Sequence, residues 1–134
     1  MSSVIDTSNN MFRWVVYNET NGNYNTDNTD EVILQSVFDR WQLVLNNTSR
    51  LPNTNYYNNG KVLINFYIKT LGSGILGSAG PDYAYPSNSW TFASFYTSEG
   101  TINLNYTYIV SLKQTVKSDG NTSLYYTILH EVGH

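Results

Sequence analysis

The chain has 134 residues, a length that suits one domain with a hydrophobic core of its own. Only 13% of the residues are charged, the formal net charge is −3, and the seven lysines and arginines form no basic patch, so nucleic acid is excluded as an expected partner. Cysteine is absent, and therefore no disulfide stabilises the fold.

The first eleven residues are mostly polar, and we expect residues 1–11 to be a flexible N-terminus. They lack the basic region and the apolar region of a signal peptide. No apolar run anywhere in the sequence approaches the length of a membrane span. We expect no contact with a membrane, and these features leave the localisation of the protein unknown.

A strand and a long helix are predicted next. Residues 12–17 are rich in β-branched and aromatic side chains, which favour an extended backbone. After a polar loop, Asn28 and Glu31 have the spacing of a capping box, the hydrogen-bonding pattern that starts many helices. The sequence then predicts an amphipathic helix over residues 32–45, because its apolar side chains recur at helical spacing.

The middle of the chain predicts further strands. Residues 61–69 alternate between apolar and other side chains, which predicts a strand that forms a parallel pair with the first one. The Gly-rich stretch 71–80 predicts a turn that leads into a short edge strand around residues 75–79. A hairpin is predicted through residues 90–96, and residues 101–106 alternate again as a strand.

The last element is a predicted helix that begins after Asp119-Gly120. Asn121, Thr122 or Ser123 can cap its start. Its apolar side chains recur at helical spacing and should face a core, whereas three other side chains fall on a separate stripe: Tyr126, His130 and His134.

Residues 130–134 read His-Glu-Val-Gly-His and fit the H-E-x-x-H pattern. On a helix, His130 and His134 lie one above the other and can aim both imidazoles at one metal ion. Imidazole nitrogen is a normal zinc ligand at about 2.0–2.1 Å. Glu131 would lie beside the metal and could act as general base toward a water molecule there. The pattern therefore indicates metal-assisted hydrolysis of an amide bond.

A catalytic zinc ion has three protein ligands, but this chain contains only two histidines and no cysteine. We expect the third ligand beyond residue 134, because the sequence stops inside a predicted helix without a capping residue. With two ligands, residues 1–134 alone should bind Zn²⁺ loosely and should hydrolyse little.

With these elements in place, the chain resembles the metzincin zinc endopeptidases, and most of all their matrixin-like branch. The resemblance covers residues 12–134 and rests on three segments: Ile75–Pro81, Gly100–Asn105 and Thr127–His134. It implies an α+β, zincin-like upper subdomain. That subdomain has a twisted mixed sheet of about four to five strands and two long helices, the second carrying the motif. The chain would then be the N-terminal part of a catalytic domain whose C-terminal subdomain is missing.

The resemblance also implies roles for individual residues. His130 and His134 match the first two zinc ligands of the family, and Glu131 matches its catalytic base. Gly133 matches a position that is commonly small. The resemblance implies a peptide or protein as substrate, bound by backbone pairing to an edge strand, and the residues that match this strand are Leu76, Gly77, Ser78 and Ala79. An extracellular location follows only by analogy with the family.

Several alternatives stay open at the level of sequence. A gluzincin, which draws its third zinc ligand from a later glutamate, also fits the motif. A different class of function is a non-enzymatic Tyr/Asn-rich binding or structural module with a vestigial H-E-x-x-H. In a third hypothesis, Glu99 and Asp119 supply carboxylates to a complete site. Asp82 is the only acidic residue in the loop after the second strand, where the family has its calcium sites, so we predict no specific calcium site. Substrate preference, activation and oligomeric state do not follow from the sequence.

Overall fold

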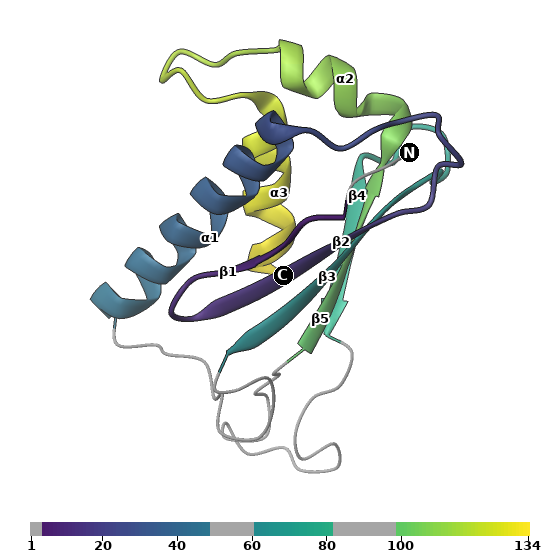
Figure 1. Cartoon of the computed structure of the whole chain (residues 1–134). Coiled ribbons are helices and arrows are strands. Elements are labelled where there is room, and N and C mark those ends of the chain that lie inside the picture. The colour runs from purple at the N-terminus through teal and green to yellow at the C-terminus, as the bar shows by residue number, and fades with distance from the viewer. Residues whose placement is uncertain (1–3, 49–60, 82–98) are drawn as a thin grey trace.

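The computed structural model describes residues 4–48, 61–81 and 99–134 (Figure 1). These residues form a five-stranded sheet and three helices, which confirms the α+β class and the expected number of strands. The predicted hairpin at residues 90–96 lies outside the described residues. The elements in chain order are β1 (Asp6–Ser8), β2 (Phe12–Asn18), α1 (Asn28–Thr48), β3 (Val62–Lys69), β4 (Gly77–Pro81), β5 (Glu99–Asn105), α2 (Tyr106–Gln114) and α3 (Ser123–Gly133).

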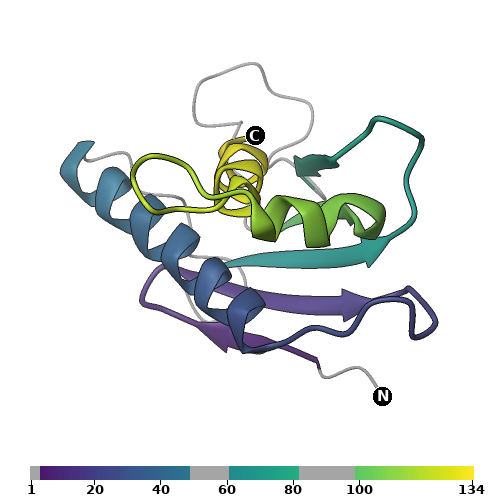
Figure 2. The ribbon, with the colours of Figure 1, turned by 90° about the horizontal axis from the view of Figure 1, so that it is seen from above.

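The sheet is mixed, with the strand order β1-β2-β3-β5-β4. Its three central strands β2, β3 and β5 are parallel, and the outer strands β1 and β4 are antiparallel to their neighbours. The predicted parallel pairing of the first strand with residues 61–69 is therefore confirmed, and α1 makes the connection between them. In this strand order β4 lies at one edge of the sheet, and it is next to α3 (Figures 1 and 2).

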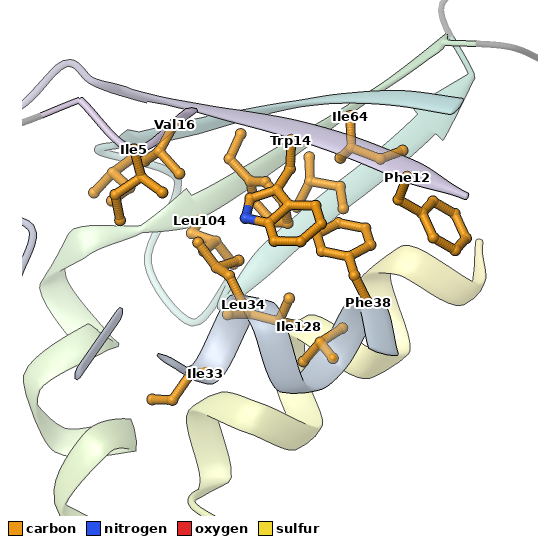
Figure 3. Close-up of a cluster of buried hydrophobic side chains, with 14 of the residues drawn as sticks. Ile5, Phe12, Trp14, Val16, Ile33, Leu34, Phe38, Ile64, Leu104 and Ile128 are labelled. Atoms are coloured by element: carbon orange, nitrogen blue, oxygen red, sulfur yellow. The ribbon is translucent and has the colours of Figure 1, made fainter. Parts of the chain in front are cut away.

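One face of the sheet packs against the helices and forms the core (Figure 3). Alternation in β3 places Val62, Ile64, Phe66 and Ile68 on this face, and all four are buried. The indole of Trp14 stacks on the ring of Phe38 from α1, with 4.4 Å between ring centroids. Burial of large side chains from both layers stabilises the contact of α1 with the sheet, at about 1.5–3 kcal/mol for each fully buried side chain.

The structure differs from the expectation of a flexible segment 1–11. Residues 6–8 form β1, which pairs with β2, and Ile5 is buried in the core. The pairing is supported by an ion pair between Arg13 and Asp6, with 3.0 Å between Nη2 and Oδ2. The Asp6 carboxylate accepts hydrogen bonds from the guanidinium and raises the pKa of Arg13. Polar side chains suit this strand because it lies at the sheet edge.

The capping box of α1 forms one residue earlier than predicted. The Asp27 carboxylate accepts from the backbone N–H of Asp30, and the Asp30 carboxylate accepts from the N–H of Asp27, both at 3.0 Å. Burial would raise the pKa of Asp27, but the Asp30 N–H and the Lys113 ammonium outweigh it and lower this pKa. The stability that Asp27 contributes is therefore present above the ordinary pKa of aspartate and is lost as the pH falls through the folded-state value.

The buried carboxylate of Asp30 joins α1 to α2. It accepts a hydrogen bond from the Tyr24 hydroxyl at 2.6 Å and lies 3.2 Å from the Lys113 ammonium. Burial and these two aspartates, Asp30 and Asp27, raise the pKa of Tyr24 well above its ordinary value, so its hydroxyl stays a donor. We refer to Tyr24, Asp27, Asp30 and Lys113 as the α1–α2 cluster.

Replacing Lys113 with methionine is expected to destabilise the fold by about 2 kcal/mol, because Asp30 then loses its charged partner while it stays buried. Chemical denaturation of both proteins measures the difference. Lys117→Met is the matched control, since Lys117 is exposed and has no ion pair among the described residues, and it should change stability by less than about 0.5 kcal/mol. Equal effects of the two substitutions would show that the α1–α2 cluster contributes nothing.

A helix that the sequence analysis did not predict follows β5 directly. In α2, the side chain of Asn105 accepts from the N–H of Thr107 and caps the helix, and Ile109 is buried in the core. The predicted strand 101–106 therefore ends one residue earlier than expected, at its cap. None of the described helices combines the length and the apolar character that a membrane crossing requires.

Candidate metal centre

The helix α3 holds the H-E-x-x-H motif in a fixed orientation. Its start is capped by Thr122, whose hydroxyl accepts from the N–H of Tyr125 at 3.1 Å, so the cap is one of the three predicted residues. The predicted apolar stripe faces the core: Leu124 and Ile128 are buried, and Tyr125, Leu129 and Val132 pack against them. The separate stripe with both histidines is therefore left on the exposed side of α3.

The imidazoles of His130 and His134 converge. Their Nε2 atoms lie 3.0 Å apart, and the two rings are nearly perpendicular, at 83°. Two nitrogen ligands at about 2.0–2.1 Å from one zinc ion in tetrahedral geometry lie about 3.3–3.4 Å from each other. The two nitrogens need only a small rotation of the rings to reach this separation. The pair therefore fits a shared metal ion.

Glu131 lies beside the two histidines with its carboxylate uncommitted. Only 9% of the residue is exposed, and its side chain has no hydrogen bond or ion pair with any described residue. Among the described residues that are not exposed, only Trp14 has a side-chain polar atom that is both shielded from solvent and without a hydrogen-bond partner. The carboxylate oxygens of Glu131 also have no such partner, so they must still reach solvent. A carboxylate in this position can accept a proton from a water molecule held near the imidazoles.

Two depressions meet at Glu131. We call the first the front groove: residues 74–77 line one side of it, and the exposed stripe of α3 with Tyr126 and His130 lines the other. The second is an apolar hollow on the other side of the motif, bordered by Trp41 and Ala79 and reached by His134. Glu131 lines both, so a chain in the front groove would contact this residue.

The edge strand β4 and the residue before it bring three of the four predicted substrate-binding residues to this site. Leu76 and Gly77 line the front groove, and Ala79 lines the apolar hollow. The side chain of Ser78 lies on the opposite face of the sheet, where its hydroxyl oxygen accepts from Asn103. Strand alternation explains the difference, since successive side chains point to opposite faces. The predicted edge strand also starts later than residue 75, because residues 72–75 form a turn.

The outer edge of β4 is free of other strands within the described residues. The N–H of Asn105 donates to the carbonyl oxygen of Leu76 at 3.0 Å, so the backbone groups of Leu76 point toward β5. Backbone groups alternate in antiparallel pairs, and those of Gly77 and Ala79 therefore point to the free edge. These two residues present the N–H and C=O groups that an extended peptide can pair with.

A contact that the sequence analysis missed holds the last turn of α3. The indole N–H of Trp41 donates to the carbonyl oxygen of Leu129 at 3.0 Å. A Cβ atom at Gly133 would lie only 2.8 Å from Cζ2 of this indole, so the close approach requires glycine. The tight packing gives a physical reason for the small residue inside the motif. No local signal could reveal it, since 88 residues separate Trp41 from Leu129.

Among the described residues, no group of three His, Asp or Glu side chains gathers around one point that could hold a metal ion. The two acidic residues considered as further carboxylates have other partners. Glu99 accepts from the side-chain amide of Asn65 at 3.0 Å, and Asp119 accepts from the hydroxyl of Tyr126. Neither lines either depression.

Comparison with known proteins adds no relative to this description: no protein-family model, no curated protein and no solved structure matches the chain. Function is therefore inferred from the residues of the candidate site and from their geometry.

Proposed function

We propose that the protein is a zinc-dependent metalloendopeptidase with His130 and His134 as metal ligands and Glu131 as general base. One observation carries the proposal: two imidazole Nε2 atoms converge to 3.0 Å beside a carboxylate that has no partner among the described residues.

The chemistry divides between the metal and the chain. A zinc ion, when bound, acts as a Lewis acid and makes a neighbouring water molecule acidic near neutral pH. Glu131 takes the proton of that water molecule and later delivers it to the leaving amine. Because Glu131 is buried apart from a small exposed fraction, few water molecules can compete for this proton between the two transfers.

The substrate in this proposal is an extended peptide that adds a strand to β4. Gly77 and Ala79 offer their free backbone groups, which pair with any sequence, while the front groove receives alternate side chains. The Cβ position of Gly77 lies 3.5 Å from Cγ of Glu131, so a strand paired there places its carbonyl group close to the carboxylate. This arrangement favours cleavage within a chain.

We assign the protein to the zincin-like fold and, within it, to the metzincins of the matrixin-like type. The support is the motif together with a mixed sheet whose antiparallel edge strand packs beside the motif helix. The third ligand then comes from outside the described residues, and any sequence that follows His134 in the natural protein is the first place to look for it.

Removal of the metal tests this proposal. Dialysis of the natural protein, with any sequence that follows His134, against a zinc chelator should abolish cleavage of casein, and one equivalent of Zn²⁺ should restore it. The parallel sample is the His130→Ala/His134→Ala double variant, which should stay inactive after the same addition. Cleavage that persists in the chelated protein, or in the double variant, would contradict the proposal.

A further inference from the structure

Three of the four residues in the wall of the front groove opposite α3, residues 74–76, belong to an irregular segment, residues 71–76, which precedes β4. A turn shapes it: the N–H of Ile75 donates to the carbonyl oxygen of Gly72 at 3.1 Å, and Gly74 has a φ of +82°. Ile75 and Leu76 are both well exposed. An exposed irregular segment has few contacts that fix its position, so its ties to the rest of the fold decide where the groove wall stands.

The strongest tie is the side chain of Asn105, the last residue of β5, which is only 1% exposed. Its amide nitrogen donates to the carbonyl oxygen of Ile75 at 2.9 Å and lies within 3.5 Å of the carbonyl oxygens of Leu71 and Gly72. Its amide oxygen accepts from the N–H of Thr107 at 3.2 Å. The backbone N–H of Asn105 adds the bond to Leu76. One buried residue thus holds both ends of the segment.

A second tie comes from the first turn of α2. The hydroxyl of Tyr108 accepts from the backbone N–H of Gly74 at 2.8 Å, at the tip of the turn. Asn105 and Tyr108 therefore fix the segment from two sides through its backbone. Neither bond depends on the side chains of the segment, which leaves those side chains free to line the groove.

The position of these ties has a consequence for the site. They fix residues 75 and 76, and Gly77, with the first free backbone groups of the edge, comes directly after them. Gly77 is also the residue of β4 whose Cβ position approaches Glu131. We infer that Asn105 is a positioning residue, which holds the groove wall so that a peptide paired with Gly77 meets Glu131 at a fixed distance. The inference rests on the proposed function.

Asn105→Ser tests it, because serine still caps α2 but is too short to reach Ile75. We expect KM for a peptide substrate to rise about tenfold, kcat to change less than about threefold and zinc affinity to stay unchanged, since the chemical groups are untouched. Amide hydrogen exchange in residues 71–77 should become about tenfold faster. Tyr108→Phe should also raise KM and the exchange rates of residues 71–77, each by a smaller factor. Asn103→Ser is the matched control and should change neither, because Asn103 also lies in β5 but its side-chain amide donates to the Ser78 hydroxyl and not to residues 71–76.

An Asn105→Ser protein whose KM and exchange rates equal those of Asn103→Ser would overturn the inference. Lower stability with an unchanged KM would do so as well, since it would reduce Asn105 to a structural residue. If the unsubstituted, zinc-loaded protein cleaves no peptide, the proposed function is contradicted and no KM can be measured. The exchange rates then decide alone: faster exchange in both Asn105→Ser and Tyr108→Phe supports the tie, and unchanged exchange overturns it.

Discussion

Substitution of Glu131 by glutamine is expected to lower kcat for peptide hydrolysis by about 10²–10⁴-fold, the usual contribution of a general base. Glutamine has nearly the same shape as glutamate and fills the same space between the front groove and the apolar hollow. Its amide cannot take a proton from water. Because the histidines are untouched, zinc affinity should remain within about threefold of that of the natural protein.

The measurement is kcat and KM of the zinc-loaded protein on one fluorogenic peptide, with zinc affinity determined on the same samples. Glu31→Gln makes the same chemical change on the exposed first turn of α1 and should leave all three quantities unchanged. A Glu131→Gln protein with more than about a tenth of the original kcat would show that another group takes the proton.

Substitution of Gly133 by valine is expected to have the largest effect on stability, a loss of about 3 kcal/mol. A Cβ atom at this position lies 2.8 Å from Cζ2 and 3.3 Å from Cη2 of the Trp41 ring, and valine adds two more methyl groups there. The indole cannot turn away without losing its hydrogen bond to Leu129. Valine fits a helix slightly better than glycine does, but by less than about 1 kcal/mol, so the clash decides the outcome.

Because α1 and α3 meet at this contact, the same substitution should also displace the last turn of α3 and weaken zinc binding about tenfold or more. A double-mutant cycle with Trp41→Leu separates the clash from other effects, since a smaller side chain at position 41 relieves it. In the Trp41→Leu background, Gly133→Val should cost less than half as much as in the natural protein. An equal cost in both backgrounds would rule out the Trp41 contact as the cause.

The strands and helices with strong periodic patterns could be predicted from the sequence. The alternation in residues 61–69 and the apolar stripe of residues 32–45 are each set by burial on one face, and β3 and α1 follow them. Burial on one face also explains why each residue of the predicted apolar stripe of α3 faces the core. The predicted capping box of α1 is one residue too late, because Asn28 with Glu31 and Asp27 with Asp30 have the same capping spacing and only the latter pair forms the bonds.

Elements without such patterns could not be found in this way. The strand β1 is polar because it lies at an edge, and its pairing with β2 depends on a neighbour rather than on its own residues. The helix α2 follows β5 without a loop, so the strand predicted over residues 101–106 runs into Tyr106, the first residue of the helix. An asparagine before an apolar run at helical spacing, Tyr106, Ile109 and Leu112, was the available signal for a helix start.

For the candidate site, the sequence predicts which side chains come together but not what holds them in place. His130, Glu131 and His134 are four residues apart at most, so helix geometry alone brings them together. Trp41 and Asn105 act through contacts with residues that are 30 or more positions away, and such contacts depend on how the layers pack. The family resemblance covers the edge strand as a whole and so includes Ser78, whereas only alternate residues of a strand face one side.

The most direct test of the central claim is a calorimetric titration of the natural protein with Zn²⁺, repeated for His130→Ala, His134→Ala and the double variant. The 134 residues contain only these two histidines, so binding through imidazole has no other source within them. We expect one zinc ion per chain, a loss of affinity of about tenfold or more in each single variant, and a larger loss in the double variant. Zinc affinity that is the same in the double variant as in the natural protein would contradict the assignment of a metal centre at His130 and His134.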